Sequence, residues 1–355
     1  MPNIAQSSYQ PKGVLKSGHL QTIFPTLFRS INTSKVQPQL YRHQYLRERL
    51  ELDDGDFLDL DWTLAKGRGN TEGQGTDDQH VSRETNNTTK LVILCHGLES
   101  STDATYMRCM AKTCQLNGWD SVGYNFRGCS GEPNRLARAY HCGLTGDLEH
   151  VVQHALQKGR YQTIALVGFS LGGNLVLKYM GERGENVVPQ IISSAAVSVP
   201  CDLADSSIQL EHWDNWIYKT RFLRLLVSKS ELKRQLIIKQ LGQWPPQEIT
   251  SIKDFDEYFT APLNGFLGAD HYYETTSSIE FLEHIKRPTL LINAKDDPLL
   301  GGNCYPYSIA ERNPSLSLET PSHGGHVGFI QNKPGGAYWH EQRIMQFLND
   351  TQSLA

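Results

Sequence analysis

A serine between two glycines is the residue of this sequence best placed to act as a nucleophile. The segment Gly168-Phe169-Ser170-Leu171-Gly172 follows the strand-forming run 163–167 and precedes the helix-compatible run 171–180. A G-x-S-x-G pattern between a strand and a helix is typical of a nucleophile elbow, a tight turn that strains the serine backbone and exposes its hydroxyl group. The pattern alone does not establish this chemistry, because a Gly-rich turn that only packs would have the same residues.

A serine hydroxyl group also needs a base to remove its proton and an acid to orient that base. Candidates for both follow the serine, in the order acid and then histidine, each after a predicted strand. We favour Asp297 as the acid because it precedes Pro298 in a turn, with Asp296 as the alternative. We favour His326 as the base because its small neighbours leave the ring room, with His323 as the alternative.

The oxyanion that forms when a serine attacks a carbonyl group needs backbone N–H donors held in place. Leu171, directly after Ser170, is expected to supply one donor. The second is expected from the segment His96-Gly97-Leu98, which follows a predicted strand, and we assign it to Leu98 because the glycine lets the chain turn this amide toward the serine. His96 is expected to support the loop rather than to transfer protons.

Short apolar segments alternate with helix-compatible segments along most of the chain, which predicts a mainly parallel sheet with helices on both faces. The alternation stops between residues 200 and 284, where we expect a helical cap inserted after the sixth strand. Residues 66–90 are rich in Gly, Thr, Asn, Asp and Gln and are predicted to form a mobile surface loop. We assign residues 1–355 to one domain. The predicted strands are 43–50 and 57–62, which form a hairpin, and 91–95, 121–125, 163–167, 191–199, 289–293 and 316–320; the predicted helices are 105–117, 144–156, 171–180, 231–241 and 340–348.

Composition excludes several classes of protein. The formal net charge of −4 does not favour nucleic acid as a partner, and no run of about 18 apolar residues predicts a membrane span. No secretory signal is visible in the polar N-terminal segment. Seven cysteines without a C-x-x-C pair argue against a zinc site or a disulfide framework, so we expect reduced thiols and a cytoplasmic location. We expect no metal and no organic cofactor, and the sequence leaves the oligomeric state open.

Five distinctive segments are spread over most of the chain: His19–Pro25, His96–Glu99, Asn125–Arg135, Gly168–Asn174 and Gly324–Phe329. Together they resemble the YheT-like branch of the α/β hydrolases. The resemblance implies the α/β-hydrolase fold and hydrolysis of carboxylic esters, and it places Ser170, Asp297 and His326 at the nucleophile, acid and base positions. It also implies that some eukaryotic relatives are acyltransferases or lipases that act on medium-chain acyl esters or phospholipids. Cys142 and Leu144 depart from the Ser and Glu expected there, which leaves the substrate open.

The sequence thus predicts a serine hydrolase for small esters with short- to medium-chain acyl groups. Two alternatives stay open: an acyltransferase that uses the same three residues, and a binding protein with a hydrolase fold and no activity. The segment 127–135 also has two interpretations. It is either a structural loop held by Arg–Glu pairs, or a segment whose Arg127 or Arg135 shapes the site or binds an anionic group.

Overall fold

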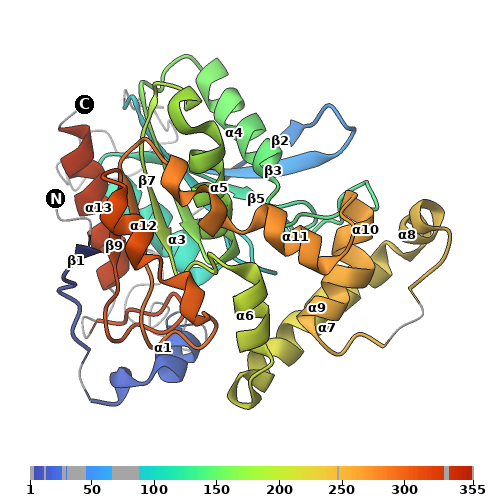
Figure 1. Ribbon diagram of the computed structural model, residues 1–355. Helices are drawn as coiled ribbons and strands as arrows, with labels where there is room; N and C mark the ends of the chain where they lie inside the picture. The colour runs from blue at the N-terminus through green and yellow to red at the C-terminus, as the bar shows by residue number, and fades with distance from the viewer. Residues whose placement is uncertain are drawn as a thin grey trace, which may run out of the picture.

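A nine-stranded sheet forms the centre of the computed structural model, which describes residues 4–11, 13–25, 29, 45–65, 88–245, 248–331 and 336–353. The strand order is β1-β9-β8-β7-β6-β4-β5-β3-β2 (Figure 1). In this spatial order, the seven strands from β1 at one edge to β5 run parallel to one another. The next strand, β3, pairs antiparallel with both β5 and β2. The strands are β1 (Ile4–Ala5), β2 (Leu46–Glu51), β3 (Phe57–Thr63), β4 (Lys90–Cys95), β5 (Asp120–Asn125), β6 (Thr163–Phe169), β7 (Ile191–Val197), β8 (Thr289–Ile292) and β9 (Leu316–Glu319).

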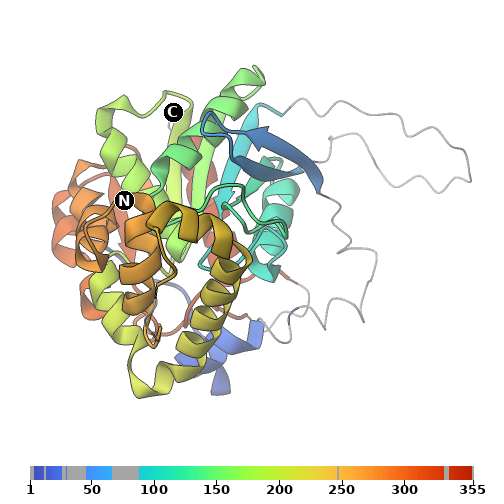
Figure 2. The same cartoon turned by 90° about the vertical axis from the view of Figure 1, so that its right-hand side faces the viewer.

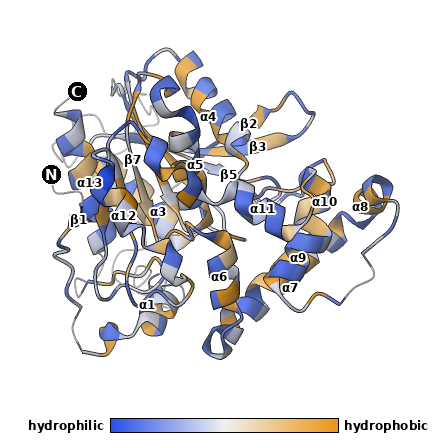
Figure 3. Cartoon of the chain, viewed as in Figure 1, coloured by the Kyte–Doolittle hydropathy of each residue, from blue (hydrophilic) through white to orange (hydrophobic). Residues whose placement is uncertain are grey.

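Helices cover both faces of the sheet because successive side chains of each strand point to opposite sides. In β4, Leu91 and Ile93 belong to the core cluster with α4 (Thr145–Gln157) and α5 (Leu171–Arg183). Val92 and Leu94 belong to the opposite cluster, with α3 (Thr105–Leu116) and α13 (Trp339–Gln352). The helices are amphipathic, with hydrophilic and hydrophobic residues on the same helix (Figure 3). Both faces of the central strands β4 and β6 are therefore buried, as the sequence predicts.

A group of helices lies between β7 and β8 and beside the sheet, as Figure 2 shows from that side. We call this group, from Leu203 to Thr276, the cap. It has a small core of its own, in which Ile237, Phe255 and Phe259 are buried. The cap consists of α6 (Leu203–Leu210), α7 (Trp216–Leu232), α8 (Arg234–Leu241), α9 (Ile252–Phe255), a π-helical turn (Asp256–Thr260), α10 (Ala261–Asn264) and α11 (Ala269–Thr276).

The predicted fold class is confirmed, and the differences lie at its edges. The two-residue strand β1, parallel to β9, was not predicted, because two residues carry no periodicity. The helix predicted at 231–241 starts only at Arg234, since α7 continues to Leu232. Of the loop predicted at 66–90, residues 66–87 lie outside the described part of the chain, and Lys90 already belongs to β4.

The cysteines and the helices bear on two further expectations from composition. All seven thiols are free, and six of them are buried. Within the described residues, none of the helices combines the length and the apolar character that crossing a bilayer requires.

Candidate active site

Ser170 occupies the turn between β6 and α5 in a strained conformation. Its backbone angles are φ 52° and ψ −121°, a region that residues with a side chain rarely adopt. Two glycines make the turn sterically possible. A Cβ atom on Gly168 would lie 2.2 Å from the Gly172 carbonyl oxygen, and one on Gly172 would lie 2.4 Å from the Cys95 carbonyl oxygen. Both glycines of the G-x-S-x-G pattern are thus required by backbone contacts.

The structure brings Ser170, His326 and Asp297 into one line of hydrogen bonds. His326 Nε2 lies 2.9 Å from Ser170 Oγ. Its Nδ1 lies 2.9 Å from Asp297 Oδ2 and 3.1 Å from Oδ1. The Asp297 side chain is fully buried, and its Oδ1 also accepts the Leu299 N–H at 3.0 Å. Asp297 therefore holds Nδ1 of the ring as the donor and leaves Nε2 to face the serine.

The two alternative residues form a separate pair. Asp296 lies 3.3 Å from Nδ1 of His323 and accepts the Gly325 N–H at 2.9 Å. Burial raises the pKa of the Asp296 carboxyl group, while the Gly325 N–H and His323 act in the opposite direction. Neither residue hydrogen-bonds to Ser170. Of the choices that the sequence leaves open, only Asp297 and His326 stand in line with the serine.

An N-terminal helix, α1 (Gly18–Phe24), holds the loop that carries His326. The Thr22 hydroxyl group accepts the His326 backbone N–H at 2.9 Å, and the Gln21 side chain accepts the Ile330 N–H at 2.8 Å. The loop also packs tightly on the helix, since a Cβ atom on Gly325 would lie 2.3 Å from the Gly18 carbonyl oxygen. The sequence analysis missed this role. The segment 19–25 carried a family resemblance but no chemical signal.

Leu98 and Leu171, the two predicted oxyanion donors, lie on either side of the serine turn. Leu171 is the first residue of α5. Leu98 lies in the loop after β4, where a Cβ atom on Gly97 would come within 3.2 Å of Ser170 Cβ. The neighbouring amides are anchored: Gly97 N–H donates to the Tyr106 hydroxyl at 2.9 Å and Glu99 N–H to the Tyr140 hydroxyl at 2.8 Å.

The amides of both leucines have no acceptor within the described part of the chain. No carbonyl or side-chain oxygen of the described residues accepts a hydrogen bond from the Leu98 N–H or the Leu171 N–H. Both residues line the same pocket as Ser170 and His326. An oxygen atom bound at the serine could therefore accept from both amides.

His96 supports the oxyanion loop, as expected, and cannot serve as a second base. Its Nε2 accepts the Phe126 N–H at 3.1 Å, and its Nδ1 lies 2.8 Å from the Gly97 carbonyl oxygen. Both ring nitrogens are therefore occupied. Burial lowers the pKa of His96 to about 3, so the ring is neutral.

Arg127 and Arg135, the two arginines singled out in the sequence, form ion pairs and do not line the pocket. Arg127 is buried, donates to both carboxylate oxygens of Asp147 at 2.8 and 2.7 Å, and also reaches Asp54 at 2.7 Å and Asp56 at 3.2 Å. Arg135 pairs with a glutamate on β2. Neither arginine lines the pocket at Ser170. The structural interpretation of the segment 127–135 is therefore favoured, although the partners of Arg127 are aspartates rather than glutamates.

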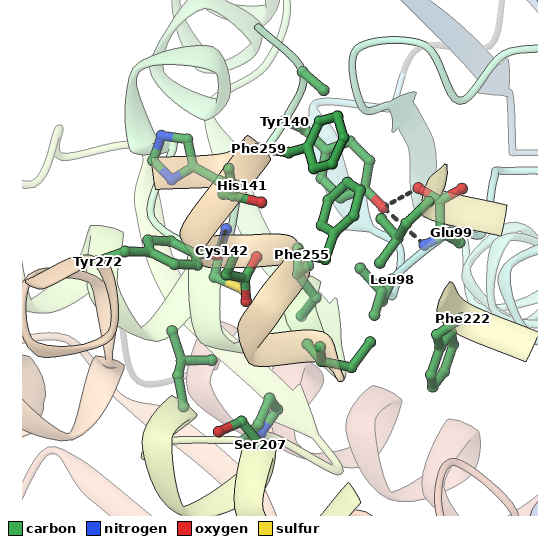
Figure 4. A pocket seen from close by; sticks show the side chains of 18 of the residues that line it. Leu98, Glu99, Tyr140, His141, Cys142, Ser207, Phe222, Phe255, Phe259 and Tyr272 are labelled. Atoms are coloured by element: carbon green, nitrogen blue, oxygen red, sulfur yellow. Dashed lines mark hydrogen bonds between the residues drawn. The ribbon is translucent and has the colours of Figure 1, made fainter. Parts of the chain in front are cut away.

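The pocket that opens at Ser170 runs between the sheet and the cap. Cap side chains make most of its apolar wall, among them Leu226, Ile237 and Phe255. Figure 4 shows Phe255 and Phe259 opposite Leu98, together with the hydrogen bonds between Tyr140 and Glu99. A chain of methylene groups attached to an acyl carbon would be enclosed by such a wall.

Comparison with known proteins agrees with the fold. Residues 90–333 match the model of the alpha/beta hydrolase fold family, so the chain is an α/β hydrolase. Within that family it belongs to the branch of the Escherichia coli (strain K12) protein named "Putative esterase YheT". The two are 32% identical over 347 residues, which cover 96% of this chain and 92% of the relative.

Two further comparisons support this assignment. The Mus musculus protein named phospholipase ABHD3 is 30% identical over 307 residues, which cover 86% of this chain and 70% of the relative. Among solved structures, the Pyrococcus furiosus esterase Pf2001 superimposes with a TM-score of 0.56 at 19% identity, covering 88% of this chain and 93% of the esterase. This structural similarity supports the fold, and the relatives place the chain among hydrolases.

Proposed function

We propose that the protein is a serine hydrolase that cleaves carboxylic esters through an acyl-enzyme on Ser170. The observation that carries this proposal is the line Ser170–His326–Asp297, with 2.9 Å contacts on both sides of the imidazole ring, at the mouth of an apolar pocket. The strained serine backbone adds support, because strain of this kind persists where function requires it.

Ser170 Oγ attacks the ester carbonyl carbon while His326 Nε2 takes its proton. Asp297 stabilises the resulting imidazolium, and the N–H groups of Leu98 and Leu171 bind the oxyanion. The C–O bond to the alcohol then breaks, and His326 gives its proton to the leaving oxygen. In the second half, His326 removes a proton from water, and the water oxygen attacks the acyl carbon. The bond between the acyl carbon and Ser170 Oγ then breaks, His326 returns the proton to Oγ, and the carboxylic acid and the free serine are released.

The substrate that fits best is an ester with a short- to medium-chain acyl group. The apolar cap wall supports this choice, since burying each methylene group of an acyl chain contributes about 0.8 kcal/mol to binding. The names esterase and phospholipase among the relatives support an ester as the substrate.

Hydrolysis of p-nitrophenyl esters with acyl chains from C2 to C12 tests the proposal. The wild-type protein should hydrolyse them with an optimum that reports the length of the pocket, and Ser170→Ala should abolish turnover. His326→Ala should do the same, whereas His323→Ala is the matched control in the same loop. Turnover that survives in Ser170→Ala would disprove the proposed nucleophile. Adding an alcohol to the assay separates hydrolysis from acyl transfer, since a transferase would yield the new ester rather than the free acid.

A further inference from the structure

One carboxylate in the apolar pocket has no part in the proposed reaction. Asp256 lines the pocket that opens at Ser170, and its neighbours Phe255 and Phe259 line the same wall. It starts the π-helical turn Asp256–Thr260, which follows α9 directly. Turns of this type are rare and occur frequently at functional sites.

Asp256 is held by hydroxyl groups and not by a cation. The Tyr273 hydroxyl on α11 donates to Asp256 Oδ2 at 2.8 Å. The hydroxyl groups of Thr260 and Tyr273 both favour the ionised form, against burial, which raises the pKa of Asp256 to about 6. In the part of the chain that the structure describes, no lysine, arginine or histidine forms an ion pair with this carboxylate.

A half-buried carboxylate without a cation lowers stability, and an apolar side chain would fit this wall at less cost. The position has a use if part of the substrate supplies a further donor beside the hydroxyl groups of Tyr273 and Thr260. A substrate hydroxyl group fits better than a cation, because the cluster offers both hydrogen-bond acceptors and hydrogen-bond donors. Asp256 accepts, while the hydroxyl groups of Tyr273, Thr260 and Ser207, which all line the pocket, can donate or accept.

We propose that Asp256 and Tyr273 form a subsite that binds a hydroxyl group of the substrate, so that the preferred substrates are hydroxylated esters. The inference rests on the proposed ester hydrolysis at Ser170, whose pocket the cluster shares. The hydroxyl group could belong to the acyl chain or to the alcohol part of the ester, and the chemistry of recognition is the same in both cases.

Pairs of esters that differ only by a hydroxyl group in place of a methyl group test the subsite. They also show whether the bound hydroxyl group belongs to the acyl chain or to the alcohol part of the ester. For the acyl chain, p-nitrophenyl 6-, 7- and 8-hydroxyoctanoate are each compared with the methyl analogue. For the alcohol part, 2-hydroxyethyl octanoate is compared with propyl octanoate. We expect kcat/KM to favour the hydroxylated member by about tenfold in one of the two sets, as a hydrogen bond to a charged group predicts.

Substitutions in the cluster should change this ratio, which is measured within each protein so that a general loss of activity cancels. In Asp256→Leu the ratio should fall close to one, and in Tyr273→Phe it should fall by a smaller factor. Thermal melting of each variant shows that it is folded. A ratio near one in every wild-type pair, or a ratio unchanged in both variants, would overturn the inference. A preference for octanoylcholine over 3,3-dimethylbutyl octanoate without any preference for hydroxyl groups would also overturn it.

Binding to Ser170→Ala separates this inference from the proposed hydrolysis. Calorimetric titration of this protein with 2-hydroxyethyl octanoate and propyl octanoate, and with ethyl 8-hydroxyoctanoate and ethyl nonanoate, needs no turnover. The same tenfold preference in Kd would support the subsite even if the wild-type protein hydrolysed none of the esters. Serine-dependent hydrolysis of plain octanoate with equal binding of both members of each pair would leave the proposed function intact and refute the subsite.

Discussion

The half-buried carboxyl group of Asp256 should make the stability of the folded protein depend on pH. Burial raises the pKa of Asp256 from 3.8 to about 6 in the folded state. The folded protein therefore binds this proton more tightly than the unfolded chain. The contribution of this proton to the free energy of unfolding is fully present below about pH 4, and it is lost as the pH rises through about 6. Because one pH unit corresponds to about 1.4 kcal/mol, the complete change in the free energy of unfolding is about 3 kcal/mol.

Replacing Asp256 with asparagine should remove this dependence. The amide oxygen can still accept from Tyr273, but the side chain cannot ionise. Relative to wild type, the free energy of unfolding of Asp256→Asn should rise by about 2 kcal/mol between about pH 4.5 and about pH 7.5, which is the part of the 3 kcal/mol that falls in this range.

Urea unfolding followed by tryptophan fluorescence at several pH values measures this difference directly. Asp270→Asn on α11 is the matched control, since it removes the same charge from an exposed position. A difference between wild type and Asp256→Asn that stays constant over this pH range would refute the reasoning, because the carboxyl group would then titrate alike in both states.

Three further substitutions test the site and its supports. Asp297→Asn should lower kcat by a factor on the order of 10⁴, because the ring of His326 loses the acceptor that fixes its tautomer, while Asp296→Asn should cost far less. Thr22→Val should lower kcat roughly three- to tenfold with little change in KM, because the His326 backbone loses a hydrogen bond. Arg127→Met should lower the free energy of unfolding by about 3–5 kcal/mol in a urea titration, because it leaves buried carboxylates unpaired.

Each substitution has a control in the chain. Equal losses of kcat in Asp296→Asn and Asp297→Asn would contradict the assignment of the acid. Thr22→Ser keeps the hydroxyl group and should restore most of the activity, so a loss as large as that of Thr22→Val would point to packing instead. Arg135→Met removes a half-exposed ion pair and should leave the unfolding midpoint close to that of wild type.

Local patterns were sufficient to predict the parts of the molecule that local geometry determines. The turn at Ser170 needs glycines two positions before and after it, because the backbones of β4, β6 and α5 meet there. That requirement is visible in seven consecutive residues. The apolar strands are equally visible, because both of their faces are buried.

The support of the histidine loop could not be predicted in this way. Thr22 and His326 are 304 positions apart, and Gln21 and Ile330 are 309 positions apart. A threonine or glutamine in a short helix has many other possible roles. Asp256 was hidden for a related reason: it lies in a π-helical turn, and such a turn interrupts the helical period by which sequence patterns are read.

The adjacent carboxylates of Asp296 and Asp297 show why sequence could rank these residues but not separate their roles. Both aspartates follow β8, and both find a histidine in the same later loop. Asp297 bonds to the ring that faces the serine, whereas Asp296 bonds to His323 and to the backbone of Gly325, one residue before His326. The second pair therefore acts on the shape of the loop rather than on the proton. A substitution at Asp296 should accordingly change kcat only as far as it displaces His326. It should leave the pH dependence of kcat unchanged.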